Sequence, residues 1–227
     1  MLVVSIFTRS TQPPNSTQAE EFLDECGYLD AGKLFSDRKT EDINALTYLG
    51  AKYLHLKFID AAWRVVEPNI ANSSQFRLRN IKRQHVYKDA RVQFSGRISI
   101  HDKRLKRIVG EEFTAIANRQ IQPTLYLAPV GVGGHADHIL VRDAVLKINP
   151  EVILWEDFPY NVATADIDKF RKEHAGYINV FNLSKNWLQK NQAIKLYKSQ
   201  VPVLFKKEIP KTAEKYYFRS SKNLKFE

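Results

Sequence analysis

Short apolar runs alternate with longer amphipathic segments along the chain. Residues 2–8 (LVVSIFT) form a continuous β-branched and aromatic run, which is typical of a buried parallel strand. Between Ser36 or Asp37, either of which can cap a helix, and Gly50, apolar residues recur at helical spacing. The pattern predicts strands at residues 2–8, 53–59, 124–129, 151–156 and 177–183. It predicts helices at residues 19–26, 37–50, 108–121, 136–148, 163–175 and 184–200.

This alternation predicts an α/β fold, a Rossmann-like and mostly parallel sheet flanked by helices. The length fits one domain, residues 1–227, and the highly charged residues 67–107 are expected to form an excursion from its core. The aromatic residues 216–218 (YYF) are expected to pack back on the body. Ligand sites of such folds lie at the carboxyl ends of the strands. Polar residues follow the predicted strands at residues 8–10, 60–64 and 131–138.

Composition excludes several classes of protein. The chain is 44% hydrophobic and 26% charged, which is ordinary for a globular protein and argues against disorder. No apolar run approaches the roughly 20 residues of a membrane helix, and the first residues lack the basic lead of a signal peptide. Cys26 is the single cysteine, so no internal disulfide is expected and a cytoplasmic location is favoured.

Two basic blocks lie on a near-neutral to acidic body, within a net charge of +10. Residues 75–107 carry 11 Lys and Arg against 2 Asp and Glu, and residues 185–227 carry 11 against 3. Such blocks indicate either an anionic partner or a solvated face that keeps the protein soluble. No nucleic-acid motif accompanies residues 75–107, so no specific nucleic-acid partner is expected.

The segment 131–138 (GVGGHADH) concentrates the candidate chemistry. Its glycines let the backbone turn sharply and approach a ligand closely. His135 and His138 are three residues apart at the predicted start of a helix, which lets both rings reach one pocket. A neutral imidazole there can bind a divalent metal, and Asp137 can orient one ring. The alternative is a helix start with a favourable aspartate and two solvent-facing histidines.

Residues 127–145 (LAPVGVGGHADHILVRDAV) resemble the second signature of the LmbE-like, PIG-L deacetylase family. The stretches DRKTEDINALTYLGAKYLHLKFIDAAWR, LWEDFPY and KNQAIKLYKSQ are similar to that family as well, so the resemblance runs from Val3 to about Tyr217. It implies the family's fold and zinc-dependent hydrolysis of the N-acetyl group of an N-acetylglucosamine-type sugar conjugate. The implied partner is that small molecule, and the oligomeric state stays open, a homo-oligomer included.

The resemblance also implies roles for the three polar residues of the motif. His138 corresponds to a zinc ligand. His135 corresponds to a histidine that, as a cation, stabilises the oxyanion or protonates the leaving amine. Asp137 corresponds to the carboxylate that tunes that histidine.

Four further residues are expected to bind the substrate or support the site. Asp60 lies at a predicted strand end and is expected to hold an active-site partner. Arg64 is expected either to contact the substrate or to lie at the surface. Arg38 and Glu41 match family positions, and a structural ion pair is the alternative for them.

The family's first signature, a P-H-x-D-D motif, has no counterpart in this sequence. In the family that motif supplies a histidine and an aspartate to the zinc and a second aspartate as general base. The resemblance therefore implies either a truncated start or a degenerate relative, with impaired hydrolysis and weak or absent zinc, because zinc sites use at least three protein ligands. The alternative function is a non-catalytic relative that binds a glycan or another anionic partner.

Overall fold

The computed structural model describes residues 1–66, 84–120, 124–163, 170, 172–174, 176–177, 179–183 and 185–219. The chain divides into two compact units, Met1–Gln93 with Asn186–Ile209 and Phe94–Lys185 with Pro210–Glu227. The single domain predicted for residues 1–227 stays a prediction. In the described part of the chain, no helix has the length and apolar character needed to span a membrane.

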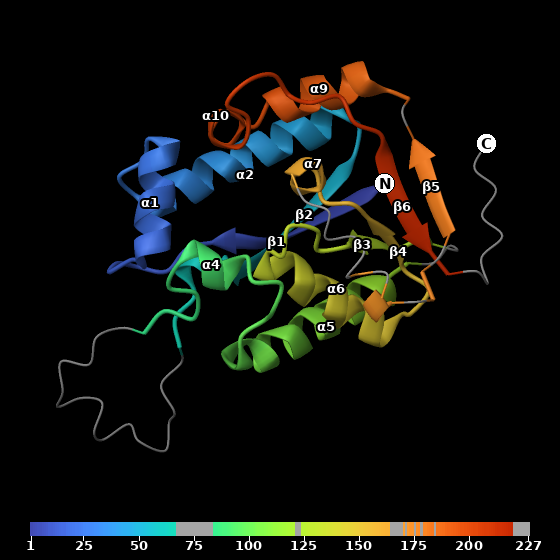
Figure 1. The fold of residues 1–227 in the computed structure, drawn as a ribbon, viewed down its shortest axis with the longest axis horizontal. Helices are drawn as coiled ribbons and strands as arrows, with labels where there is room; N and C mark the ends of the chain where they lie inside the picture. The colour runs from blue at the N-terminus through green and yellow to red at the C-terminus, as the bar shows by residue number, and fades with distance from the viewer. Residues whose placement is uncertain are drawn as a thin grey trace. The chain divides into compact units, whose positions relative to one another are not determined.

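The first unit is built on two parallel strands, β1 (Leu2–Arg9) and β2 (Lys52–Ile59). Helix α2 (Ala31–Tyr48) runs beside both strands and also packs against α9 (Figure 1). Trp63 fills the core of this unit, because its ring meets Phe35 edge-on at 5.0 Å. The remaining elements are α1 (Thr17–Cys26), η1 (Ala61–Trp63), α4 (Ala90–Gln93), α9 (Trp187–Lys195) and α10 (Val201–Leu204).

One carboxylate on α2 joins three other segments of the first unit. Asp42 accepts hydrogen bonds from the Ser5 hydroxyl at 2.8 Å and the Tyr197 hydroxyl at 2.6 Å, and it lies 2.8 Å from Nε2 of His55. Burial and this neighbouring carboxylate raise the pKa of Tyr197. The hydroxyl therefore stays protonated and ties the C-terminal segment to α2.

Two predicted helices of this unit have different bounds. α2 begins at Ala31 rather than after Ser36 or Asp37, because the carboxylate of Asp30 accepts from the Lys33 N–H at 2.7 Å and caps the helix. The predicted helix 184–200 is shorter, since α9 ends at Lys195 and α10 starts as a separate turn with a proline in its first positions.

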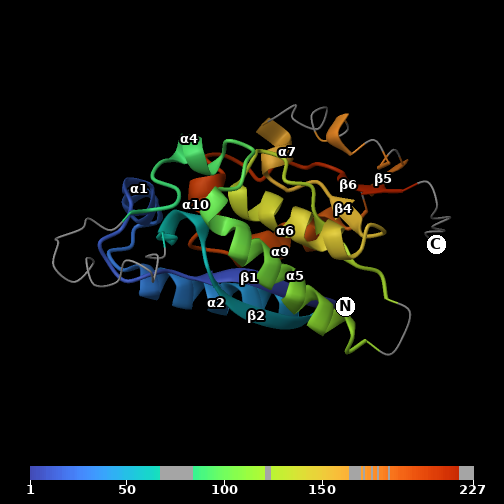
Figure 2. The same ribbon diagram turned by 90° about the horizontal axis from the view of Figure 1, so that it is seen from below.

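The second unit contains a four-stranded sheet in the order β3-β4-β6-β5. β3 (Leu127–Pro129) and β4 (Ile153–Trp155) are parallel, whereas β6 (Glu214–Phe218) runs antiparallel to both β4 and β5 (Asn179–Leu183). Helices α5 (Lys103–Ala117) and α6 (Ala136–Ile148) lie side by side in this unit (Figure 2). The short elements η3 (Ile100–Asp102) and α7 (Tyr160–Ala163) complete it.

The predicted α/β class is confirmed, and the predicted helix at 136–148 has the observed bounds. α5 starts at Lys103, five residues before the predicted start at residue 108. β6 was not predicted as a strand, but its aromatic run does pack back, with Tyr217 in the core and its hydroxyl donating to Glu156. Residues 67–83 of the expected excursion and most of the predicted helix 163–175 lie outside the described residues.

Candidate functional site

The glycine-rich loop after β3 is held tightly between neighbouring segments. Gly133 and Gly134 have positive φ angles of 81° and 74°. A Cβ on Gly134 would lie 2.6 Å from the carbonyl oxygen of Phe94, and one on Gly133 would lie 2.7 Å from Cβ of Tyr160. Only glycine adopts these positive φ angles easily and also leaves out the Cβ atom for which there is no room. The loop therefore lets the start of the following helix lie close to Phe94 and Tyr160.

His135 follows this loop and caps α6 with its own ring. Its Nδ1 accepts a hydrogen bond from the backbone N–H of Asp137 at 3.2 Å. A ring nitrogen that accepts a hydrogen bond carries no proton, so this contact corresponds to the tautomer with its proton on Nε2. A cationic His135, as the resemblance implies, could not accept this hydrogen bond at Nδ1, and its role in catalysis stays a prediction.

His138, one turn into α6, meets a carboxylate from the neighbouring strand. Its Nδ1 lies 2.7 Å from Oδ1 of Asp157, which follows the carboxyl end of β4. The Asp157 side chain is 2% exposed, whereas that of His138 is 33% exposed. The two atoms are at ion-pair distance, and both are buried.

The second oxygen of Asp157 holds the glycine-rich loop. Oδ2 accepts from the backbone N–H of Gly131 at 2.7 Å and from that of Val132 at 2.9 Å. One buried carboxylate thus fixes both the loop and the ring of His138. Sequence reasoning did not place Asp157 in the site, although its position after the strand next to β3 is a signal that could have done so.

Aromatic rings surround the two histidines. The rings of His135 and His138 lie 5.0 Å apart between centroids. Phe94 meets His135 edge-on at 4.9 Å, and Tyr160 meets His138 edge-on at 5.5 Å. Sequence reasoning did not place Phe94 in the site, because it lies far from the motif in the chain, whereas Tyr160 could be expected from the sequence in an aromatic wall for a sugar.

Asp137 is buried at the same helix start. Its backbone N–H provides the hydrogen bond to His135 given above. The predicted tuning of His135 by the Asp137 carboxylate stays a prediction.

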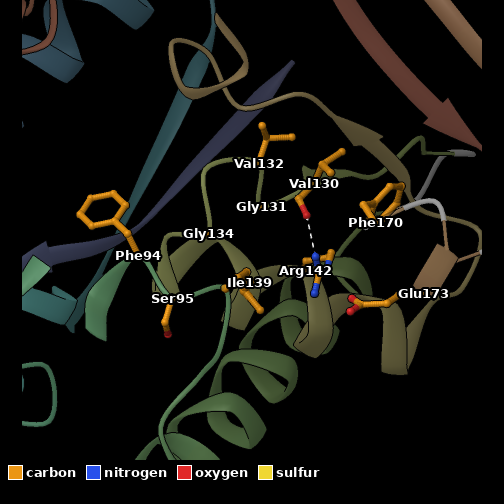
Figure 3. A pocket seen from close by; sticks show the side chains of 11 residues that line it. Phe94, Ser95, Val130, Gly131, Val132, Gly134, Ile139, Arg142, Phe170 and Glu173 are labelled. Carbon is orange, nitrogen blue, oxygen red and sulfur yellow. Dashed lines mark hydrogen bonds between the residues drawn. The ribbon is translucent and has the colours of Figure 1, made fainter. Parts of the chain in front are cut away.

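Behind the loop lies a cavity of about 190 Å³, lined by the loop itself and by Phe94, Ile139 and Arg142 among others. Figure 3 shows Arg142 reaching from α6 toward the carbonyl of Val130, to which its Nη1 donates at 2.8 Å. Its Nε donates to Asp143 at 3.0 Å. Arg142 therefore supports the base of the loop.

The four other predicted site residues belong to the first unit, whereas the two histidines belong to the second. Asp60 caps η1, where its Oδ1 accepts from the Ala62 N–H at 2.9 Å. Arg64 is 5% exposed and therefore not at the surface. Its guanidinium lies over the ring of Phe7 at 5.1 Å, and its Nε donates to the carbonyl of Ile59.

Arg38 and Glu41 both belong to α2, and each has its own partner on another segment. The guanidinium of Arg38 lies 4.7 Å from the ring centre of Phe22. Glu41 accepts from both the backbone N–H and the hydroxyl of Ser199, each at 2.7 Å. These contacts stabilise the first unit, and the expected role of the two residues in substrate binding stays a prediction.

The zinc implied by the resemblance can be tested against the donors present. Nδ1 of His138 and Oδ1 of Asp157 are buried, lack hydrogen bonds and are donor types that zinc accepts. Three protein ligands are needed, and the described residues contain no group of three His, Cys, Asp or Glu side chains that could hold a metal. These residues therefore do not form a zinc site by themselves.

No family model matches the sequence, and no curated protein is significantly similar to it. Solved structures do match. A deacetylase of teicoplanin biosynthesis has a TM-score of 0.71 at 22% identity, with 97% of this chain and 87% of that chain covered. The zinc-inhibited form of a teicoplanin deacetylase has a TM-score of 0.68 at 23% identity, covering 97% and 88%. A deacetylase–teicoplanin complex has a TM-score of 0.68 at 22% identity, covering 97% and 87%.

These similarities extend over nearly the whole chain, and they show that it has the fold of these deacetylases. At such identities they show the fold and not the activity. The loop with His135 and His138 lies where the sheet of such a fold is expected to carry its site, at the carboxyl ends of β3 and β4.

Proposed function

We propose that this protein acts on the N-acetyl group of an N-acetylglucosamine-type sugar conjugate as an amide hydrolase. One observation carries the proposal: Asp157 joins His138 to the glycine-rich loop at the carboxyl ends of two parallel strands. The similar structures support it, since their names describe deacetylases and one of them contains teicoplanin. The single cysteine supports a cytoplasmic location.

In this proposal His135 stabilises the transition state. The N–H group at its Nε2 can donate a hydrogen bond to the amide oxygen as negative charge develops there. A neutral donor suffices for this role, and its Nδ1 stays bound to the helix start, so the ring is already oriented before the substrate binds.

His138 supplies a nitrogen lone pair to the same site. Its Nδ1 is buried beside Asp157, while a third of the side chain is exposed, so the exposed part of the ring lies away from Nδ1. The resemblance assigns this residue to zinc. Because the described residues do not complete a zinc site, we derive no step through the metal and propose that hydrolysis by these residues alone is slow.

A second candidate function is favoured by that incomplete donor set. A relative without a complete metal site could bind a glycan beside Phe94 and Tyr160 without cleaving it. Aromatic rings suit this role because they pack well against apolar surfaces.

One experiment separates the two functions. Acetate release from an N-acetylglucosamine conjugate is measured with added zinc, and binding of the same conjugate is measured by calorimetry. Acetate release that depends on His135 supports the hydrolase. Binding without acetate release, in a protein that unfolds cooperatively, supports the non-catalytic glycan binder.

A further inference from the structure

A broad groove on the second unit gathers cationic side chains that the histidine site does not use. It is lined by Lys106 of α5, Lys147 of α6 and Arg219, which follows β6, and its volume is about 510 Å³. Lys106 belongs to the basic block 75–107 and Arg219 to the basic block 185–227. The fold therefore brings one cation from each basic block to the same groove.

The charges in this groove do not balance. Asp143 and Glu173 also line it, but Asp143 is engaged by the buried Arg142, whose Nη2 lies 3.0 Å from its Oδ1. Lys106 and Lys147 make no ion pair or hydrogen bond with any residue that the structure describes. Three cations thus face the single carboxylate of Glu173, which leaves an excess of positive charge.

Neighbouring contacts fix the walls of the groove. The Arg219 guanidinium lies over the ring of Tyr177 at 5.4 Å, and the Tyr177 hydroxyl donates to the carbonyl of Pro150 at 2.7 Å. His174 adds no positive charge near neutral pH, because burial and the nearby Arg142 lower its pKa. The contact with Tyr177 thus positions Arg219, while the two lysines project into the groove from two packed helices, α5 and α6.

We propose that this groove binds the phosphate group of a small molecule. Lysine ammonium groups are compact charges that hold phosphate, and the planar arginine donor group matches phosphate oxygens. A dianionic phosphate offsets the excess of two positive charges that remains after Glu173 is counted. The volume lies within the range of about 300–1,000 Å³ that is usual for small-molecule sites.

The test is a titration of the full chain with inorganic phosphate at constant ionic strength, followed by calorimetry. Lys106→Gln combined with Lys147→Gln should weaken phosphate binding at least about tenfold, since two of three cations are lost. Glu173→Gln should strengthen it, because a repelling carboxylate is removed. Lys195→Gln, an exposed charge on α9 in the first unit, is the control for net charge and should leave binding unchanged.

Glucose 6-phosphate and glucose are titrated in parallel to identify the source of the phosphate. Tighter binding of glucose 6-phosphate than of inorganic phosphate assigns the groove to phosphorylated sugars, and equal binding assigns it to the phosphate group alone. The proposal is overturned if neither phosphate compound shows saturable binding. It is also overturned if the double lysine variant binds like the unmodified chain, or if Lys195→Gln weakens binding as much. None of these outcomes depends on acetate release, so the groove and the hydrolase proposal can fail separately.

Discussion

Nδ1 of His138 lies 2.7 Å from Oδ1 of Asp157, although one residue belongs to α6 and the other follows β4. The remaining oxygen of Asp157 accepts from two backbone N–H groups of the glycine-rich loop. The position of the His138 ring and the path of the loop therefore depend on one buried carboxylate.

Removal of this carboxylate should destabilise the second unit. Asp157→Ala leaves the buried N–H groups of Gly131 and Val132 without their acceptor, and the free energy of unfolding should fall by about 2–4 kcal/mol. Asp157→Asn keeps an oxygen that can accept from both, so it should cost less than half as much. Urea denaturation measures both values. Asp24→Ala, at an exposed position, should change stability by less than about 0.5 kcal/mol. An Asp157→Ala protein as stable as the unmodified chain would contradict this account.

The glycine-rich loop should tolerate no side chain at Gly134. Gly134 and Gly27 have nearly the same φ, 74° and 73°, but a Cβ meets the Phe94 carbonyl at 2.6 Å in the first case and nothing within 4 Å in the second. Gly27→Ala should therefore cost about 1–2 kcal/mol, the price of the left-handed backbone alone. Gly134→Ala should cost about 1–3 kcal/mol more, because backbone must shift. Chemical denaturation of the two variants gives the difference, and equal losses would show that the clash is relieved without cost.

The cap that His135 provides should be replaceable. His135→Ala removes the acceptor of the Asp137 N–H and should cost about 0.5–2 kcal/mol of stability. Asparagine is a favoured cap, so His135→Asn should stay close to the unmodified chain in thermal unfolding. If both variants lose the same stability, the ring acts through its packing against Phe94 instead.

His174 should make stability depend on pH. Burial, followed by the charge of Arg142, lowers its pKa below the ordinary value of 6.5. As the pH falls through 6.5, the unfolded chain binds a proton before the native protein does, so the free energy of unfolding decreases until the native pKa is reached. His174→Gln should remove this part of the decrease between pH 7 and pH 5, as measured by urea denaturation. His101→Gln, at an exposed position, serves as the control, and identical pH profiles for the unmodified and His174→Gln proteins would refute the prediction.

Local patterns in the sequence predicted much of the fold. The glycine-rich turn and the apolar spacing after it predicted the helix at 136–148 with its observed bounds. The pattern failed where a contact distant in sequence decides the structure. β6 exists because Tyr217 packs in the core and pairs its strand with β4 and β5, which no local periodicity reveals.

Some residues of the candidate site can be found from the sequence, and others only from the structure. His135 and His138 stand out because two imidazoles three residues apart follow a glycine-rich turn at a predicted helix start, and the motif itself carries that information. Asp157, Phe94 and Tyr160 come to the site only through the parallel pairing of β3 with β4 and the folding of the segments before and after them. Their place in the site therefore follows from the three-dimensional structure and not from local sequence patterns.

The most direct test of the proposed function is the rate of acetate release from an N-acetylglucosamine conjugate, compared between the unmodified chain and His135→Asn. Because asparagine keeps the helix cap, the comparison isolates the donor on Nε2 from the stability of the fold. The account predicts slow release that still exceeds the rate in buffer and falls about 10²–10³-fold in His135→Asn, the loss expected for one oxyanion donor. Equal release by the two proteins would contradict the account.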